Sequence, residues 1–232
     1  MNIFHSMTAS RLNKHQIGIS ENADQFCLVY IKDDKVHSLW QQKPYDYNLF
    51  IRQAVRFLPK FTVVRPIPYQ YIWRKYLFFP AHYTLPTLYQ QVIQCLTQEL
   101  PIPIEEIYFD YIIEKQPENP VIRVAIHALR KNYAEPLLTH SPTILDCEYY
   151  CFLRGFHHLY TEPFEDIRQH RYLIGEHVVQ FKSDKLTVSE KTPQDEDAAD
   201  IFRFTDLALS NDTPDPFLFI SALGACLWNG KV

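Results

Sequence analysis

Residues 85–111, LPTLYQQVIQCLTQELPIPIEEIYFDY, contain a helix pattern followed directly by a strand pattern. A proline at the first turn favours a helix start, and the span Pro86–Glu99 carries an apolar stripe at helical spacing. The stripe consists of Leu88, Val92, Cys95, Leu96 and Leu100. Pro101 ends the helix, and alternation over Ile107–Glu114 predicts a strand. A helix that passes straight into a strand predicts a mixed α/β fold.

Further strands and helices lie on both sides of this stretch. Before it we predict strands at His15–Ser20, Gln25–Ile31, Val36–Gln41, Thr62–Ile67 and Tyr71–Phe79, and a helix at about Tyr47–Leu58. After it we predict strands at Val121–Leu129 and Thr143–Asp146, a helix at about Cys147–His158, one bent strand over Tyr172–Gly175 and His177–Lys182, and a strand at Lys185–Ser189. A capping box at Thr192–Asp195 predicts a short helix, and Pro216–Trp228, with Asp215 as N-cap, predicts the last one.

Charge and glycine content argue against two broad classes of function. Lys and Arg number 23 against 27 Asp and Glu, a net charge of −4, whereas a protein that binds nucleic-acid phosphates is expected to be basic. The chain has only 5 glycines, and none is spaced for a Walker loop or a dinucleotide-binding loop. General nucleic-acid binding and the glycine-rich nucleotide folds are therefore both disfavoured.

The cysteines and histidines do not form a metal-binding pattern. The five cysteines include no C-x-x-C pair and lie among apolar residues, so we expect buried, reduced thiols. Four of the ten histidines are His157, His158, His170 and His177, and no two of them have the one-turn spacing of a zinc helix. We expect no metal.

No catalytic group or membrane segment is evident. The nucleophile motif G-x-S-x-G is absent, and adjacent acids such as Glu105 and Glu106 are typical of helix ends rather than of an acid–base pair. Met1–Arg11 lacks the apolar core of a signal peptide, and the apolar run Pro216–Trp228 is too short to span a bilayer. We expect a cytoplasmic protein that is not an enzyme.

One basic and aromatic cluster leaves an alternative open. Arg65, Trp73, Arg74 and Lys75 lie among tyrosines, a composition that suits a stacking platform for single-stranded DNA. The same composition is typical of a half-buried strand on which long cationic side chains cover aromatic rings. The acidic net charge favours the structural interpretation.

The order of these elements resembles the opening of an actin-like half-domain, and the motifs resemble the PilM family of type IV pilus assembly proteins. The family segment of the form "iPyplde-v-fDy" corresponds to Ile102–Asp110. Arg130-Lys131 matches the end of the next family strand, Leu145–Glu148 matches "vDvE", and Ala222–Ala225 matches the terminal "AlGlAl" helix. The length suits the shorter ComA-like or HofM-like members. The resemblance implies a truncated actin-like fold, with residues 1–60 and 130–232 as the core and 61–129 as an inserted subdomain.

The nucleotide motifs of that family are degenerate in this chain. ATP-binding members begin with G-I-D-I-G-S, whereas here Ser20 replaces the aspartate after Gly18-Ile19, and Asn22 replaces the second glycine. Near Tyr172–Gln180, where a second phosphate hairpin would fall, only Gly175 remains. A carboxylate for Mg²⁺ and glycine amides for phosphate are thus missing, so we expect no bound cofactor.

The resemblance implies an adaptor function. We expect this chain to bind the N-terminal tail of a single-span inner-membrane protein similar to PilN, at the cytoplasmic face of the membrane, in a pilus-like DNA-uptake (competence) machine. We expect neither direct nucleic-acid binding nor membrane insertion. The candidate peptide anchors are Phe109, Tyr111, Tyr89 and Ile93, on the predicted strand 107–114 and helix 86–99. Two alternatives remain, a retained ATP site and direct binding of single-stranded DNA.

Overall fold

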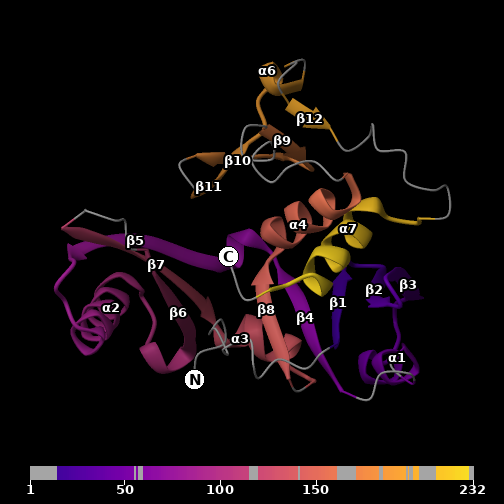
Figure 1. Ribbon diagram of the computed structural model, residues 1–232, viewed down its shortest axis with the longest axis horizontal. Helices are drawn as coiled ribbons and strands as arrows, with labels where there is room; N and C mark the ends of the chain where they lie inside the picture. The colour runs from indigo at the N-terminus through magenta and orange to yellow at the C-terminus, as the bar shows by residue number, and fades with distance from the viewer. Residues whose placement is uncertain are drawn as a thin grey trace.

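The computed structural model describes residues 15–54, 56, 60–114, 120–140, 142–160, 171–182, 185–196, 198, 201–203 and 213–229. These residues form three sheets, of five, three and four strands (Figure 1). The expectations for Met1–Arg11, for His170 and for the end of the first helix at residues 57–58 concern positions outside the described residues.

The central sheet has the strand order β3-β2-β1-β4-β8. Its strands are β1 (His15–Glu21), β2 (Gln25–Lys32), β3 (Lys35–Gln42), β4 (Phe61–Ile67) and β8 (Thr143–Cys147). Strand β2 is antiparallel to both β1 and β3, whereas β4 is parallel to β1 and β8 is parallel to β4. The mixed α/β class is confirmed.

Helices cover both faces of the central sheet. Successive side chains of its strands point to opposite faces, and both faces carry apolar side chains that pack against helices. Ile17 and Ile19 of β1 pack with Phe50 and Ile51 of α1 (Tyr47–Ala54) on one face. On the other face lie α4 (Glu148–Tyr160) and α7 (Pro216–Cys226), which pack against each other (Figure 1). Helix α7 is buried along almost its whole length, and Asp215 caps its first turn as predicted.

Three of the glycines allow close backbone contact rather than phosphate binding. A Cβ on Gly18 of β1 would overlap the carbonyl oxygen of Ala222 on α7. A Cβ on Gly224 of α7 would overlap the carbonyl oxygen of Cys151 on α4, and Gly155 of α4 meets α7 in the same way. The sheet and the two helices therefore approach one another to distances that only glycine permits.

The three-stranded sheet, β5-β7-β6, is antiparallel and carries α2 on one face. Its elements are β5 (Ile72–Pro80), α2 (Leu85–Glu99), β6 (Ile107–Glu114) and β7 (Val121–Arg130). The predicted helix and strand of residues 85–114 are thus confirmed within one residue. Phe61–Ile67, assigned above to the inserted subdomain, is β4 of the central sheet, and the separate sheet begins at β5. Otherwise the division into core and insertion stays a prediction.

The four-stranded sheet, β11-β10-β9-β12, packs beside α4 and is the smaller second part of the fold (Figure 1). It contains β9 (Arg171–Ile174), β10 (His177–Lys182), β11 (Lys185–Glu190), the short helix α6 (Pro193–Glu196) and β12 (Ile201–Arg203). The prediction of one bent strand over residues 172–182 is wrong, because β9 and β10 pair antiparallel around a turn at Gly175, where φ is +59°. The capping box is confirmed, since Asp195 accepts a hydrogen bond from the Thr192 backbone at 2.9 Å.

Two short elements connect β7 to β8. Helix α3 (Lys131–Ala134) continues from the end of β7, and a 3₁₀ turn at Glu135–Leu137 follows it. Tyr133 of α3 stacks on Tyr71, which precedes β5, with ring centroids 4.5 Å apart. The entry to the three-stranded sheet and the exit from it therefore lie side by side.

Candidate functional site

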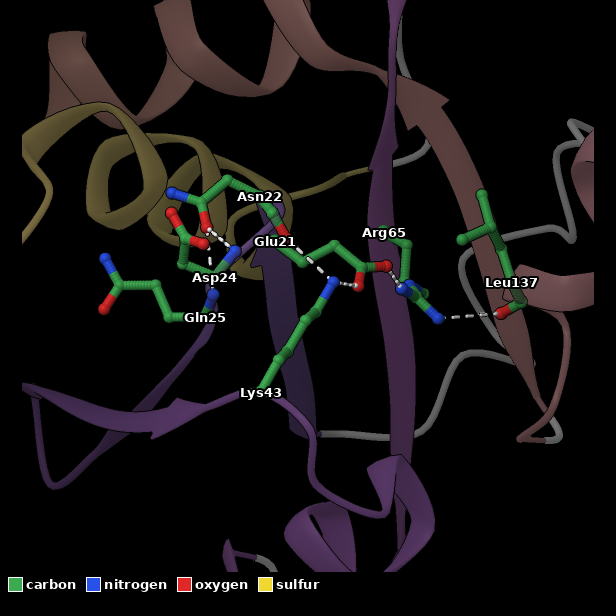
Figure 2. Close-up of polar contacts among 7 residues, drawn as sticks. All are labelled: Glu21, Asn22, Asp24, Gln25, Lys43, Arg65 and Leu137. Carbon is green, nitrogen blue, oxygen red and sulfur yellow. Dashed lines mark hydrogen bonds and ion pairs between the residues drawn. The ribbon is translucent and has the colours of Figure 1, made fainter.

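The β1–β2 hairpin is closed by the side chain of Asn22 (Figure 2). Its Oδ1 accepts hydrogen bonds from the backbone N–H groups of Asp24 and Gln25, both at 2.9 Å. Its Nδ2 donates to Asp215 at the start of α7, at 3.1 Å. A phosphate hairpin needs free backbone amides that point at the anion. In this hairpin the Asn22 side chain occupies two of those amides.

Glu21 holds an ion-pair network at the carboxyl end of β1 (Figure 2). Its carboxylate pairs with Arg65 of β4 and, at 2.6 Å, with Lys43. Lys43 also donates to the Asn22 carbonyl at 2.7 Å, and Arg65 donates to the Leu137 carbonyl at 3.5 Å. Both cations at this edge are thus engaged with a carboxylate of the protein itself. Neither is available to a phosphate unless that network breaks.

A cavity of about 230 Å³ lies beside this network. Ser20, which replaces the expected metal-side aspartate, is buried in its wall, and the Ser221 hydroxyl there is buried with no hydrogen-bond partner in the described part of the chain. Glu148 accepts a hydrogen bond from the Tyr69 N–H at 2.8 Å, and burial raises the pKa of its carboxyl group. The wall offers two small hydroxyl groups but no free charge pair for a metal-bound phosphate.

The other predicted nucleotide positions lie apart. Gly18 faces α7 from within β1, whereas Gly175 forms the open turn between β9 and β10 in a different sheet. Among Gly18, Ser20, Asn22 and Gly175, only Ser20 and Asn22 lie near the carboxyl end of β1. The absence of a bound nucleotide stays a prediction.

The four candidate peptide anchors come together between α2 and β6. The Tyr89 ring centroid lies 6.2 Å from that of Phe109 and 6.5 Å from that of Tyr111. Tyr89 is 46% exposed, and Ile93, one helical turn later, is half-buried. We call these four residues the α2–β6 patch. Their role in binding a peptide stays a prediction.

Strand β6 is an edge strand, but one of its backbone amides is already used. The Asp110 side chain accepts a hydrogen bond from the Tyr111 N–H at 2.8 Å. The edge strand β8 has the same arrangement, because Asp146 accepts from the Cys147 N–H at 2.8 Å. An amide bonded in this way cannot pair with an added strand. A peptide that added a strand next to β6 would therefore lose one backbone hydrogen bond at Tyr111.

A larger cavity, of about 560 Å³, lies where the three-stranded sheet meets α3, and we call it the groove cavity. Its wall comes from residues Gln70–Arg74, Leu100–Ile102, Ile107, Ala128–Arg130 and Tyr133. The stacked rings of Tyr71 and Tyr133 border both this cavity and the smaller one. Apolar and aromatic side chains line it together with the polar side chains of Gln70, Arg74 and Arg130, and a pocket that combines the two is typical of ligand sites. The sequence did not reveal this cavity.

The residues proposed for single-stranded DNA do not share a surface. Arg65 lies in β4 and pairs with Glu21, while Lys75 of β5 pairs with Glu99 of α2. Trp73 shares the α2-facing side of β5 with Lys75, and Arg74 points to the opposite side because strand neighbours alternate. A stacking platform needs its rings and cations on one face.

No metal site is formed by the part of the chain that the structure describes: no three His, Cys, Asp or Glu side chains gather there. The five thiols are all buried and unpaired, and burial raises the pKa of Cys147 to about 12 and that of Cys226 to about 11. The expectation that the protein holds no metal stays a prediction. Within the same described residues, no helix has the length and apolar character needed to cross a membrane.

Comparisons with known proteins give structural likenesses but no family. No family model matches the sequence, and no curated protein matches it. A PilM-PilN type IV pilus biogenesis complex resembles it with a TM-score of 0.48 at 15% identity, over 75% of this chain and 58% of that one. The cytoplasmic domain of EpsL, an inner-membrane component of the Vibrio cholerae type II secretion system, gives 0.47 at 8% identity, over 76% and 71% of the two chains.

A Bacteroides thetaiotaomicron protein with an actin-like ATPase fold and unknown function gives a TM-score of 0.38 at 11% identity, over 82% of this chain and 75% of that one. The chain thus spans less than two thirds of the PilM-PilN structure's chain. All three TM-scores are below 0.5, so these likenesses do not assign a family.

Proposed function

We propose that this protein is a non-enzymatic adaptor at the cytoplasmic face of the inner membrane. In this proposal the groove cavity binds the N-terminal tail of a single-span membrane protein similar to PilN. The machine served is a type IV pilus-like system for DNA uptake. The sequence motifs supply the family resemblance, and the groove cavity is the observation that carries the proposal, because it is larger than the cavity beside Ser20 and has exposed tyrosine rings in its wall.

The exposed tyrosine pair supports peptide binding at this place. Tyr71 is 42% exposed and Tyr133 is 41% exposed, although their rings stack on each other. Exposed aromatic rings at the mouth of an apolar cavity are typical anchors for a peptide side chain. Ile72 and Ile102 continue the apolar wall beyond them.

The closed β1–β2 hairpin supports an adaptor over an ATP-binding protein. Asn22 occupies two hairpin amides, and Glu21 already pairs with both Lys43 and Arg65. A nucleotide would have to displace these contacts and would gain no carboxylate for its metal at Ser20. The retained but degenerate ATP site remains the second candidate, supported only by the cavity beside Ser20.

Calorimetric binding of a synthetic tail peptide tests the proposal. The peptide comprises the cytoplasmic residues of the single-span protein encoded next to this chain, and we expect micromolar affinity or better for the full-length protein. Replacing both tyrosines (Tyr71→Ala with Tyr133→Ala) should weaken binding about thirtyfold, because it removes one stacked aromatic anchor worth about 2 kcal/mol.

Two further variants locate the site. Phe78→Ala removes an aromatic ring that is 63% exposed outside the wall of the groove cavity, so it should leave the affinity unchanged. Tyr89→Ala with Tyr111→Ala tests the α2–β6 patch. If only that variant loses binding, the peptide binds at the α2–β6 patch and not in the groove cavity. If the wild-type protein does not bind the peptide, the adaptor proposal is wrong.

A further inference from the structure

The groove cavity contains two arginines and no acidic residue. Arg74 and Arg130 line it, and no Asp or Glu side chain forms part of its wall. The nearby Glu99 on α2 is paired with Lys75. The cavity is therefore positive in a chain whose net charge is −4.

Neither arginine has an acidic partner within the described residues. Arg74 is half-buried, lies over the Tyr69 ring with its Cζ 3.0 Å from the centroid, and donates to the Tyr69 carbonyl at 3.3 Å. Arg130 is exposed at the end of β7, where it pairs with Ile107 of β6, and its side chain forms no ion pair with a carboxylate of the described residues. By contrast, Arg65, Arg123, Arg154 and Arg171 all pair with carboxylates. Arg74 already contacts the Tyr69 ring and carbonyl, whereas the Arg130 side chain at the rim can form a charge-assisted hydrogen bond with a ligand carboxylate.

We propose that the occupant of the groove cavity is an extended apolar peptide segment with one acidic side chain, whose carboxylate pairs with Arg130 at the rim. This inference rests on the function proposed above and specifies the chemistry of the tail. Because the proposed partner presents its N-terminal tail, the carboxylate comes from an Asp or Glu side chain and not from a chain terminus.

The shape and composition of the wall favour a peptide over a polyanion. Ile72, Leu100 and Ile102 provide apolar surface that a phosphate backbone would not use. Nucleic acid requires several phosphate contacts for useful affinity, and the wall offers only two cations. A single carboxylate on an apolar segment matches both features of the wall.

To obtain probes without assuming the sequence of the tail, we would select 12-residue peptides that bind the full-length protein from a random display library. We expect the selected peptides to share aliphatic residues and one Asp or Glu, and to lose binding to the Tyr71→Ala/Tyr133→Ala variant. For the strongest peptide, replacing its acid by the matching amide should weaken binding to the wild-type protein about tenfold, the effect of one charged hydrogen bond.

The same pair of peptides is then measured on Arg130→Gln and on Arg52→Gln, a control that removes an exposed arginine of α1. The acid and amide peptides should bind Arg130→Gln equally, whereas Arg52→Gln should keep the tenfold difference. Two results would overturn the inference and leave the adaptor function standing. One is a set of selected peptides without Asp or Glu. The other is the same ratio of acid-peptide to amide-peptide affinity in Arg130→Gln and in Arg52→Gln. Failure to select any peptide that depends on the two tyrosines would count against the proposed function itself. Tight binding of a 12-nucleotide single-stranded DNA that Arg130→Gln abolishes would replace the peptide by nucleic acid.

Discussion

Asn22 determines what the β1–β2 hairpin can bind. Its side chain bonds two backbone amides of its own turn and also reaches Asp215, which caps α7. The hairpin is therefore tied to a buried helix, and the amides of Asp24 and Gln25 are not free to bind an anion. One change from glycine to asparagine accounts for both effects, because a glycine at this position would supply neither the acceptor nor the donor.

We predict that millimolar ATP with Mg²⁺ leaves the melting temperature of this protein unchanged. Binding at a hundredfold excess over Kd would stabilise the fold by about 2.7 kcal/mol, which is easily detected. Differential scanning fluorimetry with ATP, with and without Mg²⁺, measures the shift. A reproducible, Mg²⁺-dependent rise in melting temperature would mean that the hairpin can open and that a nucleotide site is retained.

At the scale of elements, the contact between α4 and α7 holds the second part of the fold to the central sheet. Gly155 and Gly224 bring the two helix backbones together, and α7 also meets Gly18 of β1. In an exposed helix, a Gly→Ala change stabilises by up to about 1 kcal/mol. In α7 the sign reverses, because the added methyl group would overlap backbone of α4 that cannot move aside.

Gly224→Ala should lower the free energy of unfolding by about 2–3 kcal/mol, the cost of overpacking a core. The matched control is Gly175→Ala, where a Cβ meets nothing within 4 Å and the positive φ alone costs about 1 kcal/mol. Urea unfolding followed by circular dichroism compares the two. A Gly224→Ala variant as stable as the wild-type protein would contradict the close contact.

A polar row crosses the three-stranded sheet and makes its stability depend on pH. His127 of β7 lies opposite Arg74 of β5 and Asp110 of β6. Burial, with Arg74 as the second cause, lowers the pKa of His127 to about 4 from its usual 6.5. Between these two values the unfolded chain binds a proton that the folded chain does not. Neutral His127 therefore makes its full contribution to the free energy of unfolding above pH 6.5, and this contribution is lost as the pH falls toward 4.

Replacement of His127 by glutamine should flatten the stability profile between pH 6.5 and pH 4. We expect the wild-type protein to lose more stability over this range than His127→Gln, by up to about 3 kcal/mol. Urea unfolding at a series of pH values gives the two profiles. Parallel profiles would show that the His127 pKa is not depressed in the folded protein.

The elements were predictable where periodicity is local. Helix 86–99 and strand 107–114 follow from side-chain spacing alone, and the structure matches them within one residue. The β9–β10 turn was missed because a single Gly-Glu pair separates two short strands of similar composition. The groove cavity could not be predicted, because five separate segments form its wall and they meet only after β5, β7 and α3 have packed. The proximity of Tyr89 to Phe109 and Tyr111 follows from the side-chain spacing of the helix and the strand. No sequence pattern indicated that Tyr71 and Tyr133 would stack.

At the scale of the whole molecule, the groove cavity lies where the three-stranded sheet meets α3, and it includes no residue of the β1–β2 hairpin. At the carboxyl end of β1, Glu21 pairs with Arg65 and Lys43, while the junction with the three-stranded sheet has exposed rings and two arginines without acidic partners in the described residues. The central claim is that a partner binds at this junction and that no nucleotide binds at the hairpin.

Hydrogen–deuterium exchange of the full-length protein tests this claim most directly, measured alone, with the membrane-protein tail peptide and with Mg²⁺-ATP. We predict that the tail slows exchange at Gln70–Arg74, Leu100–Ile107 and Ala128–Tyr133, and that ATP changes nothing at Glu21–Gln25. Slower exchange at Glu21–Gln25 with ATP, or protection by the tail confined to other segments, would contradict the account.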